Sequence, residues 1–211
     1  IVHYRAKRGK TKNIEKDEIF LCDSGGQYKY GTTDVTRTIC FSNQKSYIKK
    51  IFTNVLKGHI AVANTDLNKK KIGKEIDVDA RKFLKKDGLD YNHGTGHGVG
   101  FFLNVHEGPQ AISKFNTVKI TDGMIVSNEP GYYKHNKFGI RIENLIYAKK
   151  NNKKLIFKNL TLAPIDKDLI NYNFLTNSEK KYLFDYHLEV YLKISPYLNK
   201  KEKKWLINFF K

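Results

Sequence analysis

Four stretches of the chain carry apolar residues at helical spacing. The longest runs from Ser46 to Ala63 and has apolar side chains at Ile48, Ile51, Phe52, Val55, Leu56 and Ile60. Positions three and four apart face the same side of a helix, so this stretch predicts a helix with one buried face. Residues 76–84, 178–192 and 205–210 repeat the pattern. We predict packing helices here, with His59 as a packing residue of the first.

Short runs rich in β-branched and aromatic residues predict strands. They comprise residues 1–4, 18–23, 32–40 and 101–105, the strand that residues 120–126 enter through Asp122-Gly123, and residues 138–147 and 155–157. The second and third runs form a predicted hairpin with its turn at residues 24–26, Ser-Gly-Gly, because glycine permits the backbone angles of tight turns. The sixth run alternates with period two, which places Arg141 and Glu143 on one face and Ile140 and Ile142 on the other.

The composition indicates a globular chain without a membrane span. Of its 211 residues, 40% are hydrophobic and 13% aromatic, enough for one sizeable domain or two small ones. No apolar run reaches the roughly 18 residues of a membrane helix, so we expect no membrane partner. Two cysteines, Cys22 and Cys40, indicate no disulfide framework, and we expect a reducing, cytoplasmic compartment. The chain begins at Ile1 without an initiator Met, and we expect that N-terminal residues are missing.

The net charge of +18 raises the question of a nucleic-acid partner, because clustered Lys and Arg neutralise phosphates. Only five of the 39 basic residues are arginine, and the lysines are scattered through every segment. This distribution is typical of a general compositional bias rather than a basic face. We therefore expect no nucleic-acid partner.

The stretch His93–Gly100 holds two histidines, four positions apart, among four glycines. So many glycines indicate backbone bent around a ligand rather than a helix. The helical zinc-protease motif needs a glutamate after its first histidine, and Gly94 stands there instead. In an extended segment His93 and His97 point to the same face, so one could bind a metal while the other contacts the substrate. A glycine-rich hairpin with surface histidines is the alternative.

Several acidic residues lie in predicted strands, where aspartate and glutamate are unfavourable. With His97 they form the set Asp23, Asp34, His97, Glu129 and Glu143. A buried carboxylate needs a partner, which could be Arg37 or a metal ion. Four carboxylates and an imidazole suit two ions of the manganese, cobalt or zinc type, whereas an all-oxygen set would suggest magnesium or calcium. Two such ions can bind a shared hydroxide and polarise a carbonyl, which favours metal-assisted hydrolysis.

Six segments, in this order, carry a family resemblance: Asp23-Ser-Gly-Gly-Gln-Tyr28, Gly31-Thr-Thr-Asp34-Val-Thr-Arg37-Thr, His93-Gly-Thr-Gly-His97-Gly-Val-Gly, Asn104-Val-His106-Glu-Gly-Pro109, Glu129-Pro-Gly-Tyr-Tyr133 and Gly139-Ile-Arg-Ile-Glu143-Asn. They resemble the catalytic domain of the cytosolic eukaryotic aminopeptidase P (Xaa-Pro aminopeptidase) family. The resemblance covers almost the whole chain, including the tail.

The resemblance implies an α/β (α+β) pita-bread fold of the creatinase and methionine aminopeptidase type, with two pseudo-symmetric halves around a dimetal site. We expect this catalytic domain in residues 1–165 and a helical extension in residues 166–211. The family's tail is associated with dimerisation, so a homodimer is expected. Family members of this type also carry two upstream domains, and we expect this chain to associate with them.

The same resemblance implies the cofactor and its ligands. Two divalent ions are expected, most simply manganese. The implied ligands are Asp23 on one ion, Asp34 and Glu143 bridging both ions, and His97 and Glu129 on the second.

The resemblance further implies catalytic roles for His93, Glu129 and His106, and substrate contacts for His3, His93, His106 and Arg141. His93 would hydrogen-bond the substrate and shuttle a proton. His3 and His106 would line the pocket for the penultimate proline, and Arg141 would steady a ligand carboxylate. Glu129 or His93 would take the proton from the bridging water, and the sequence leaves that choice open.

The resemblance thus implies hydrolysis of the N-terminal Xaa-Pro bond, with peptides carrying proline at the second position as substrates. Two alternatives share the fold. One is a prolidase, which cleaves Xaa-Pro dipeptides, and the other is a non-catalytic pita-bread protein that binds a partner.

Overall fold

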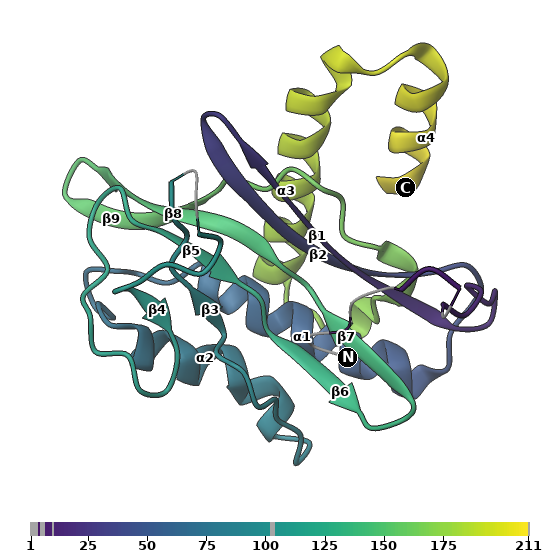
Figure 1. Ribbon diagram of the computed structural model, residues 1–211, viewed down its shortest axis with the longest axis horizontal. Coiled ribbons are helices and arrows are strands. Elements are labelled where there is room, and N and C mark those ends of the chain that lie inside the picture. Colours follow the sequence, from purple (N-terminus) through teal and green to yellow (C-terminus); the bar gives the residue numbers. More distant parts are fainter. Residues whose placement is uncertain (1–3, 5–6, 10, 102–103, 211) are drawn as a thin grey trace.

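The computed structural model describes residues 4, 7–9, 11–101 and 104–210. Its helices are α1 (Ser46–Ala63), α2 (Gly73–Lys85), α3 (Asn177–Ile194) and α4 (Lys200–Phe210), with short 3-10 helices η1 (Lys167–Leu169), η2 (Tyr172–Phe174) and η3 (Ser195–Tyr197). Its strands are β1 (Ile19–Tyr28), β2 (Gly31–Cys40), β3 (Gly96–His97), β4 (Ala111–Ile112), β5 (Ile125–Asn128), β6 (Gly131–Lys134), β7 (Phe138–Arg141), β8 (Asn144–Asn151) and β9 (Lys154–Asn159). In Figure 1 the long β1–β2 hairpin crosses the molecule diagonally, with α1 and α2 below it and α3 and α4 above.

The β1–β2 hairpin is longer than its sequence predicts. β1 pairs with β2 along the full length of both strands, so the turn lies at residues 29–30. The predicted turn at residues 24–26 is therefore wrong, because this stretch continues β1. Gly25 pairs with Asp34, and a Cβ on Gly25 would lie 2.6 Å from the backbone oxygen of Thr33. Glycine here permits a close approach of backbone across the hairpin rather than a turn.

The other strands form three antiparallel sheets, β3–β4, β5–β8–β9 and β6–β7. The predicted strand over residues 138–147 is interrupted, because β7 ends at Arg141 and β8 begins at Asn144. At the interruption the Glu143 backbone N–H donates to the Thr36 carbonyl of β2 at 3.0 Å. At the break between β7 and β8, the chain therefore hydrogen-bonds to β2 of the hairpin instead of to a partner in either sheet.

Two other predicted strands differ from the structure. The prediction of a strand over residues 101–105 is wrong, because the described residues of this run belong to no strand. The Gly100 N–H instead donates to the Asn104 carbonyl at 2.8 Å. The run 1–4 lies outside the described residues except for Tyr4, which belongs to no strand.

The two central helices follow the apolar pattern closely. The predicted bounds of α1 are confirmed, and α2 begins at Gly73, three residues before its predicted start. Phe52 and Leu56 of α1 are fully buried, and burial of such side chains stabilises the fold by about 2 kcal/mol each. A Cβ on Gly58 would lie 2.3 Å from the Ala80 carbonyl oxygen. Glycine at this position therefore lets α1 and α2 pack in close contact.

His59 is confirmed as a packing residue. Its side chain is fully buried in α1, and its Nδ1 lies 3.1 Å from the carbonyl oxygen of Asn128. Burial lowers the pKa of His59 to about 3, so the ring is neutral at physiological pH.

The C-terminal helices pack on the rest of the chain through buried and partly buried aromatic rings. α3 begins with a capping box, in which Thr176 Oγ1 accepts from the Glu179 N–H at 3.3 Å. The Ile165 N–H donates to His187 Nε2 of α3 at 3.1 Å, and the His187 ring stacks on Phe210 of α4 at 4.6 Å between centroids. None of the helices in the described part of the chain has the length and hydrophobicity needed to span a membrane.

Candidate metal centre

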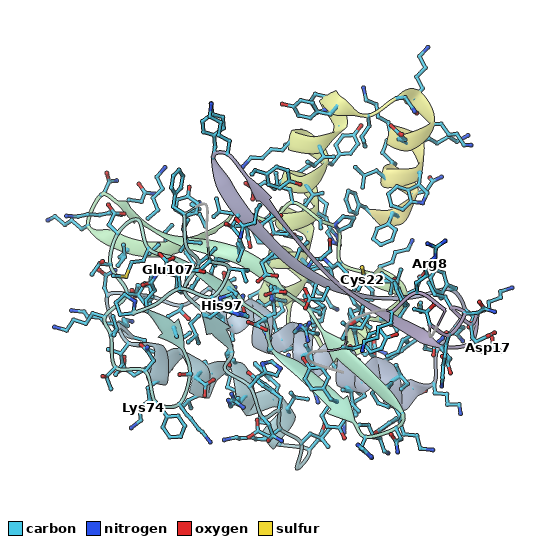
Figure 2. The ribbon with its side chains drawn as sticks, viewed as in Figure 1. Arg8, Asp17, Cys22, Lys74, His97 and Glu107 are labelled. Carbon is cyan, nitrogen blue, oxygen red and sulfur yellow. The ribbon has the colours of Figure 1, made fainter. Side chains whose placement is uncertain are left out.

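The five predicted ligands meet at one place, although they come from five separate segments. Asp23 lies in β1, Asp34 in β2, His97 in β3, Glu129 just after β5 and Glu143 between β7 and β8. Their ligand atoms fall into adjoining groups whose members lie within 4.8 Å of one another: Asp23 with Asp34 and Glu143, His97 with Glu129 and Glu143, and Asp34 with His97 and His106. Figure 2 shows His97 beside the long hairpin, near the middle of the molecule.

The hairpin register brings the two aspartates together. Asp23 pairs with Thr36, and Asp34 pairs with Gly25, so the aspartates are diagonal neighbours on one face of the ladder. His97 Nε2 lies 3.4 Å from Asp34 Oδ2 and 3.3 Å from Glu129 Oε1. The His97 imidazole therefore lies between the carboxylate of Asp34 in the hairpin and that of Glu129 at the end of β5.

Neighbouring hydroxyl and carbonyl groups orient these side chains. Thr36 Oγ1 donates to Glu143 Oε2 at 2.6 Å, and Ser127 Oγ donates to Glu129 Oε1 at 3.0 Å. His97 Nδ1 lies 2.9 Å from the Gly98 carbonyl oxygen, which can only accept. Nδ1 therefore carries a proton, and Nε2 is the nitrogen that faces the carboxylates and that would bind a metal ion through its lone pair.

The arginine that pairs with this cluster is Arg141 rather than Arg37. Arg141 Nη2 donates to Asp23 Oδ2 at 2.6 Å, and its Nε donates to Thr36 Oγ1 at 3.0 Å. Its Nη1 donates to the Tyr133 hydroxyl at 2.8 Å. The alternative in which Arg37 pairs with an aspartate is wrong, because the Arg37 guanidinium donates its hydrogen bonds to other groups, among them the carbonyls of Pro164 and Glu143.

His93 lies next to this arginine–tyrosine pair. Its Nε2 lies 2.9 Å from the Tyr133 hydroxyl, and its Nδ1 lies 2.7 Å from the Gly94 carbonyl oxygen. The carbonyl fixes the proton on Nδ1, so Tyr133 donates to Nε2. Burial lowers the pKa of His93 to about 4, so the ring is neutral near pH 7 and has a proton-accepting nitrogen.

Of the other two predicted site histidines, the structure describes His106 but not His3. His106 is exposed and lies edge-on to His97, with 4.1 Å between ring centroids and 83° between ring planes. The structure therefore brings His106 to the cluster. His3 lies outside the described residues.

A buried ion pair on α2 holds the loop that carries His93. Arg81 Nε donates to Asp77 Oδ2 at 2.8 Å, and its two Nη groups donate to the carbonyls of Tyr91 and His93. Thr95 Oγ1 donates to Asp77 Oδ1 at 2.6 Å. The sequence patterns did not predict this network, although Asp77 and Arg81 lie four positions apart on an amphipathic helix, a spacing typical of ion pairs.

Most of the chain matches one known protein family. Residues 1–150 match metallopeptidase family M24, and residues 153–209 match the C-terminal region of peptidase M24. The chain belongs to metallopeptidase family M24.

Relatives within this family carry one recurring name. The M24 chain is 47% identical over 209 residues to a probable Xaa-Pro aminopeptidase P of Laccaria bicolor, in an alignment that covers 94% of this chain and 33% of the relative. It is 44% identical over 211 residues to a probable Xaa-Pro aminopeptidase P of Pyrenophora teres f. teres, covering 95% and 32%. The chain thus spans about a third of the length of these curated relatives.

Solved peptidase structures share the fold of this M24 chain. The X-prolyl aminopeptidase from Caenorhabditis elegans, described as a cytosolic enzyme with a di-nuclear active site, superimposes with a TM-score of 0.90 at 37% identity, covering 99% of this chain and 36% of that one. The prolidase from Pyrococcus horikoshii OT3 has a TM-score of 0.63 at 31% identity, covering 71% and 42%. The pita-bread fold and the resemblance to the aminopeptidase P catalytic domain are confirmed.

In the absence of a cation, two glutamates of the M24 centre, Glu129 and Glu143, hold their protons to a higher pH than free carboxyl groups do. Burial raises the pKa of Glu129 to about 7. Burial, together with the charges of Glu129 and Asp34, raises the pKa of Glu143 to about 8. Several carboxylates in a partly buried cluster repel one another, and divalent ions relieve that repulsion. The donor set of four carboxylates and one imidazole nitrogen therefore fits a pair of divalent ions.

The first prediction is that divalent metal binding strengthens as the pH rises. Because the pKa values of Glu129 and Glu143 are raised in the folded protein, the protonated side chains contribute to the stability of the metal-free fold at low pH. That contribution is lost as the pH rises through about 7 for Glu129 and about 8 for Glu143. An ion must displace these two protons, so we expect the Mn²⁺ dissociation constant to fall on the order of 1000-fold between pH 6 and pH 8.5. Calorimetry in buffers of different ionisation enthalpy measures both the affinity and the protons released. An affinity that is independent of pH, without proton release, would contradict the assignment of these glutamates as ligands.

Proposed function

We propose that this chain is the catalytic region of a dinuclear Xaa-Pro aminopeptidase, which hydrolyses the bond between an N-terminal residue and a following proline. The observation that carries the proposal is the meeting of Asp23, Asp34, His97, Glu129 and Glu143 at one cluster. The names of the relatives and of the Caenorhabditis elegans structure support the substrate class.

The proposed cofactor is a pair of divalent ions, most simply manganese. One ion would be held by Asp23, Asp34 and Glu143, and the other by His97 and Glu129 with the same bridging pair. When bound, the two ions lower the pKa of a water molecule and polarise the scissile carbonyl. Mixed nitrogen and oxygen ligands suit manganese, cobalt and zinc alike, so the choice of manganese rests on the family resemblance.

The proposed roles of the chain's own residues follow from their contacts. Glu129 is the proposed acceptor of the proton from the attacking water, because its carboxylate lies in the ligand cluster, where the Ser127 hydroxyl orients it. His93 Nε2 would exchange its contact with Tyr133 for a hydrogen bond to the substrate, and it would pass the proton taken up by Glu129 to the nitrogen of the leaving group. Arg141 would orient the Asp23 carboxylate.

The proposed substrate pocket lies on the His106 side of the cluster. The His106 ring, packed on edge against His97, would form one wall for the penultimate proline, and we assign His3 to the same pocket on the family resemblance. A proline ring is rigid and apolar, and ring faces of imidazoles provide contact area for it. We further propose a homodimer formed through the C-terminal helices and a cytosolic location.

A prolidase is the second candidate function, supported by the shared fold with the Pyrococcus horikoshii prolidase. A prolidase acts on dipeptides, whereas an aminopeptidase of this type accepts longer peptides. A non-catalytic binding protein is the third candidate, and it requires that the purified protein holds no metal.

Release of the N-terminal residue from an Xaa-Pro-Xaa tripeptide, with added Mn²⁺ and then with a chelator, tests the proposal. We expect chelator-sensitive cleavage of this tripeptide and none of a matched Xaa-Ala-Xaa peptide. Cleavage of Xaa-Pro dipeptides alone would instead establish the prolidase. Metal-loaded protein that cleaves neither peptide would overturn the proposal.

A further inference from the structure

One buried guanidinium connects the metal centre to the C-terminal region. Arg37 follows Thr36 in β2 and donates hydrogen bonds on the side away from the carboxylate cluster. Its acceptors are Pro164 O at 2.8 Å, Thr36 O at 2.8 Å, Glu143 O at 2.6 Å, Asn144 Oδ1 at 2.7 Å, Ala163 O at 2.8 Å and the Tyr186 hydroxyl at 3.0 Å. Every nitrogen of the guanidinium thus has a partner.

Two of these bonds fix the backbone of a proposed ligand. Arg37 Nη1 contacts the carbonyls of both Thr36 and Glu143. Thr36 in turn accepts from the Glu143 N–H at 3.0 Å and donates to its carboxylate at 2.6 Å. Glu143 lies in the break between β7 and β8, where no β-ladder holds it. Arg37 and Thr36 therefore replace the missing ladder at its N–H, its carbonyl and its side chain.

Tyr186 of α3 supports the far side of the guanidinium. Its hydroxyl accepts from Arg37 Nη2 and lies 2.7 Å from the Ala163 carbonyl, to which it donates. Its side chain is buried, with 3% exposed. The hydroxyl supplies an acceptor in a place where water has little access, and it keeps the planar guanidinium aligned with the Glu143 carbonyl.

We propose that Tyr186 and Arg37 form a positioning relay through which the C-terminal region sets the geometry of Glu143 in the metal centre. This inference rests on the proposed function in one respect, that Glu143 is a metal ligand. Tyr186 and Arg37 are positioning residues, because they act through Glu143 without contact with substrate or metal. Groups that orient a metal ligand typically change metal affinity 10- to 100-fold when removed.

The variant Tyr186→Phe, made in the purified protein, tests the relay because it removes only the hydroxyl. We expect its Mn²⁺ affinity, measured by calorimetry, to fall about 5- to 10-fold, somewhat less than for direct partners of a ligand. With metal at saturation, kcat on an Xaa-Pro-Xaa tripeptide should fall while KM stays close to wild type. The variant Arg37→Lys, which keeps the charge and loses the fork of donors, should show a larger loss of affinity.

Tyr182→Phe is the matched control. Tyr182 lies one turn earlier on α3, its ring stacks with Tyr186 at 6.4 Å, and its hydroxyl accepts from Asn159 instead of Arg37. The Tyr182→Phe variant should bind Mn²⁺ with the same affinity as the wild-type protein. Wild-type affinity in Tyr186→Phe, or an equal loss in both tyrosine variants together with an equal fall in melting temperature, overturns the relay.

The two proposals fail in different ways. A metal-loaded wild-type protein that leaves Xaa-Pro peptides uncleaved overturns the proposed function, while the difference in Mn²⁺ affinity between wild type and Tyr186→Phe still decides the relay. A wild-type protein that binds no Mn²⁺ overturns the relay as well, because Glu143 would then hold no ion.

Discussion

Replacing Glu143 by Gln is expected to lower kcat/KM on an Xaa-Pro peptide about 1000-fold or more, an increase of ~4 kcal/mol in the barrier. Glu143 belongs to two of the three ligand groups, one with Asp23 and Asp34 and the other with His97 and Glu129. It is therefore the proposed bridge between both ions, and its 2% exposure leaves little room for water to replace it. Glutamine keeps the shape and removes the charge, so at least one of the two ions should be lost.

The measurement combines metal content of the dialysed protein with steady-state kinetics. Asp34→Asn should behave similarly, because Asp34 also contributes to two groups. Glu18→Gln is the matched control, since Glu18 is exposed and follows Asp17, which lies at the far end of the hairpin from His97 in Figure 2. Glu143→Gln protein with two bound ions and wild-type turnover would remove Glu143 from the metal centre.

Local patterns in the sequence predicted the helices well, because a helix depends on spacing that a short window contains. The bounds of α1 followed from its apolar stripe alone. The hairpin turn could not be predicted in this way, because Gly25 is required by a contact with Thr33 on the other strand. Glycine in a turn and glycine at a close approach of two strands look the same in sequence.

The candidate ligands could be predicted because they contradict their local surroundings. Asp23 and Asp34 occupy strands that would otherwise favour β-branched or aromatic residues, and such conflicts are typical of functional sites. The local pattern left Arg37 open as the partner of these carboxylates, and only the family resemblance implied that Arg141 would steady one of them. Whether Arg37 or Arg141 reaches Asp23 depends on which strands lie side by side, and local spacing does not contain that information.

The residues around the centre were the hardest to foresee. Tyr133 and Thr36 are ordinary strand residues by composition, and their roles arise from hydrogen bonds between separate segments. The Thr36–Glu143 contact joins residues 107 positions apart, and the His93–Tyr133 contact joins residues 40 positions apart. Tyr186 is more distant still, since its α3 helix follows all the strands of the described chain. Long-range contacts of this kind orient ligands without leaving a motif.

Replacing His93 by Ala is expected to lower kcat about 100- to 1000-fold while the metal content stays at the wild-type level. His93 is neutral near pH 7, because burial lowers its pKa to about 4, and its Nε2 accepts from Tyr133. It belongs to none of the ligand groups in the described part of the chain, so its loss should remove a proton carrier and a substrate contact, with the ions still held. Steady-state kinetics and metal analysis on the same preparation check this result.

His135→Ala provides the matched control, because His135 is exposed in the turn between β6 and β7 and belongs to none of the ligand groups found among the described residues. It should leave both kcat and metal content unchanged. Tyr133→Phe should lower kcat by a smaller factor than His93→Ala, because it removes the hydroxyl that orients His93 Nε2 and leaves the imidazole in place. If His93→Ala lost metal and turnover in equal proportion, His93 would be a ligand or a structural residue, and the proton transfer would fall to Glu129 alone.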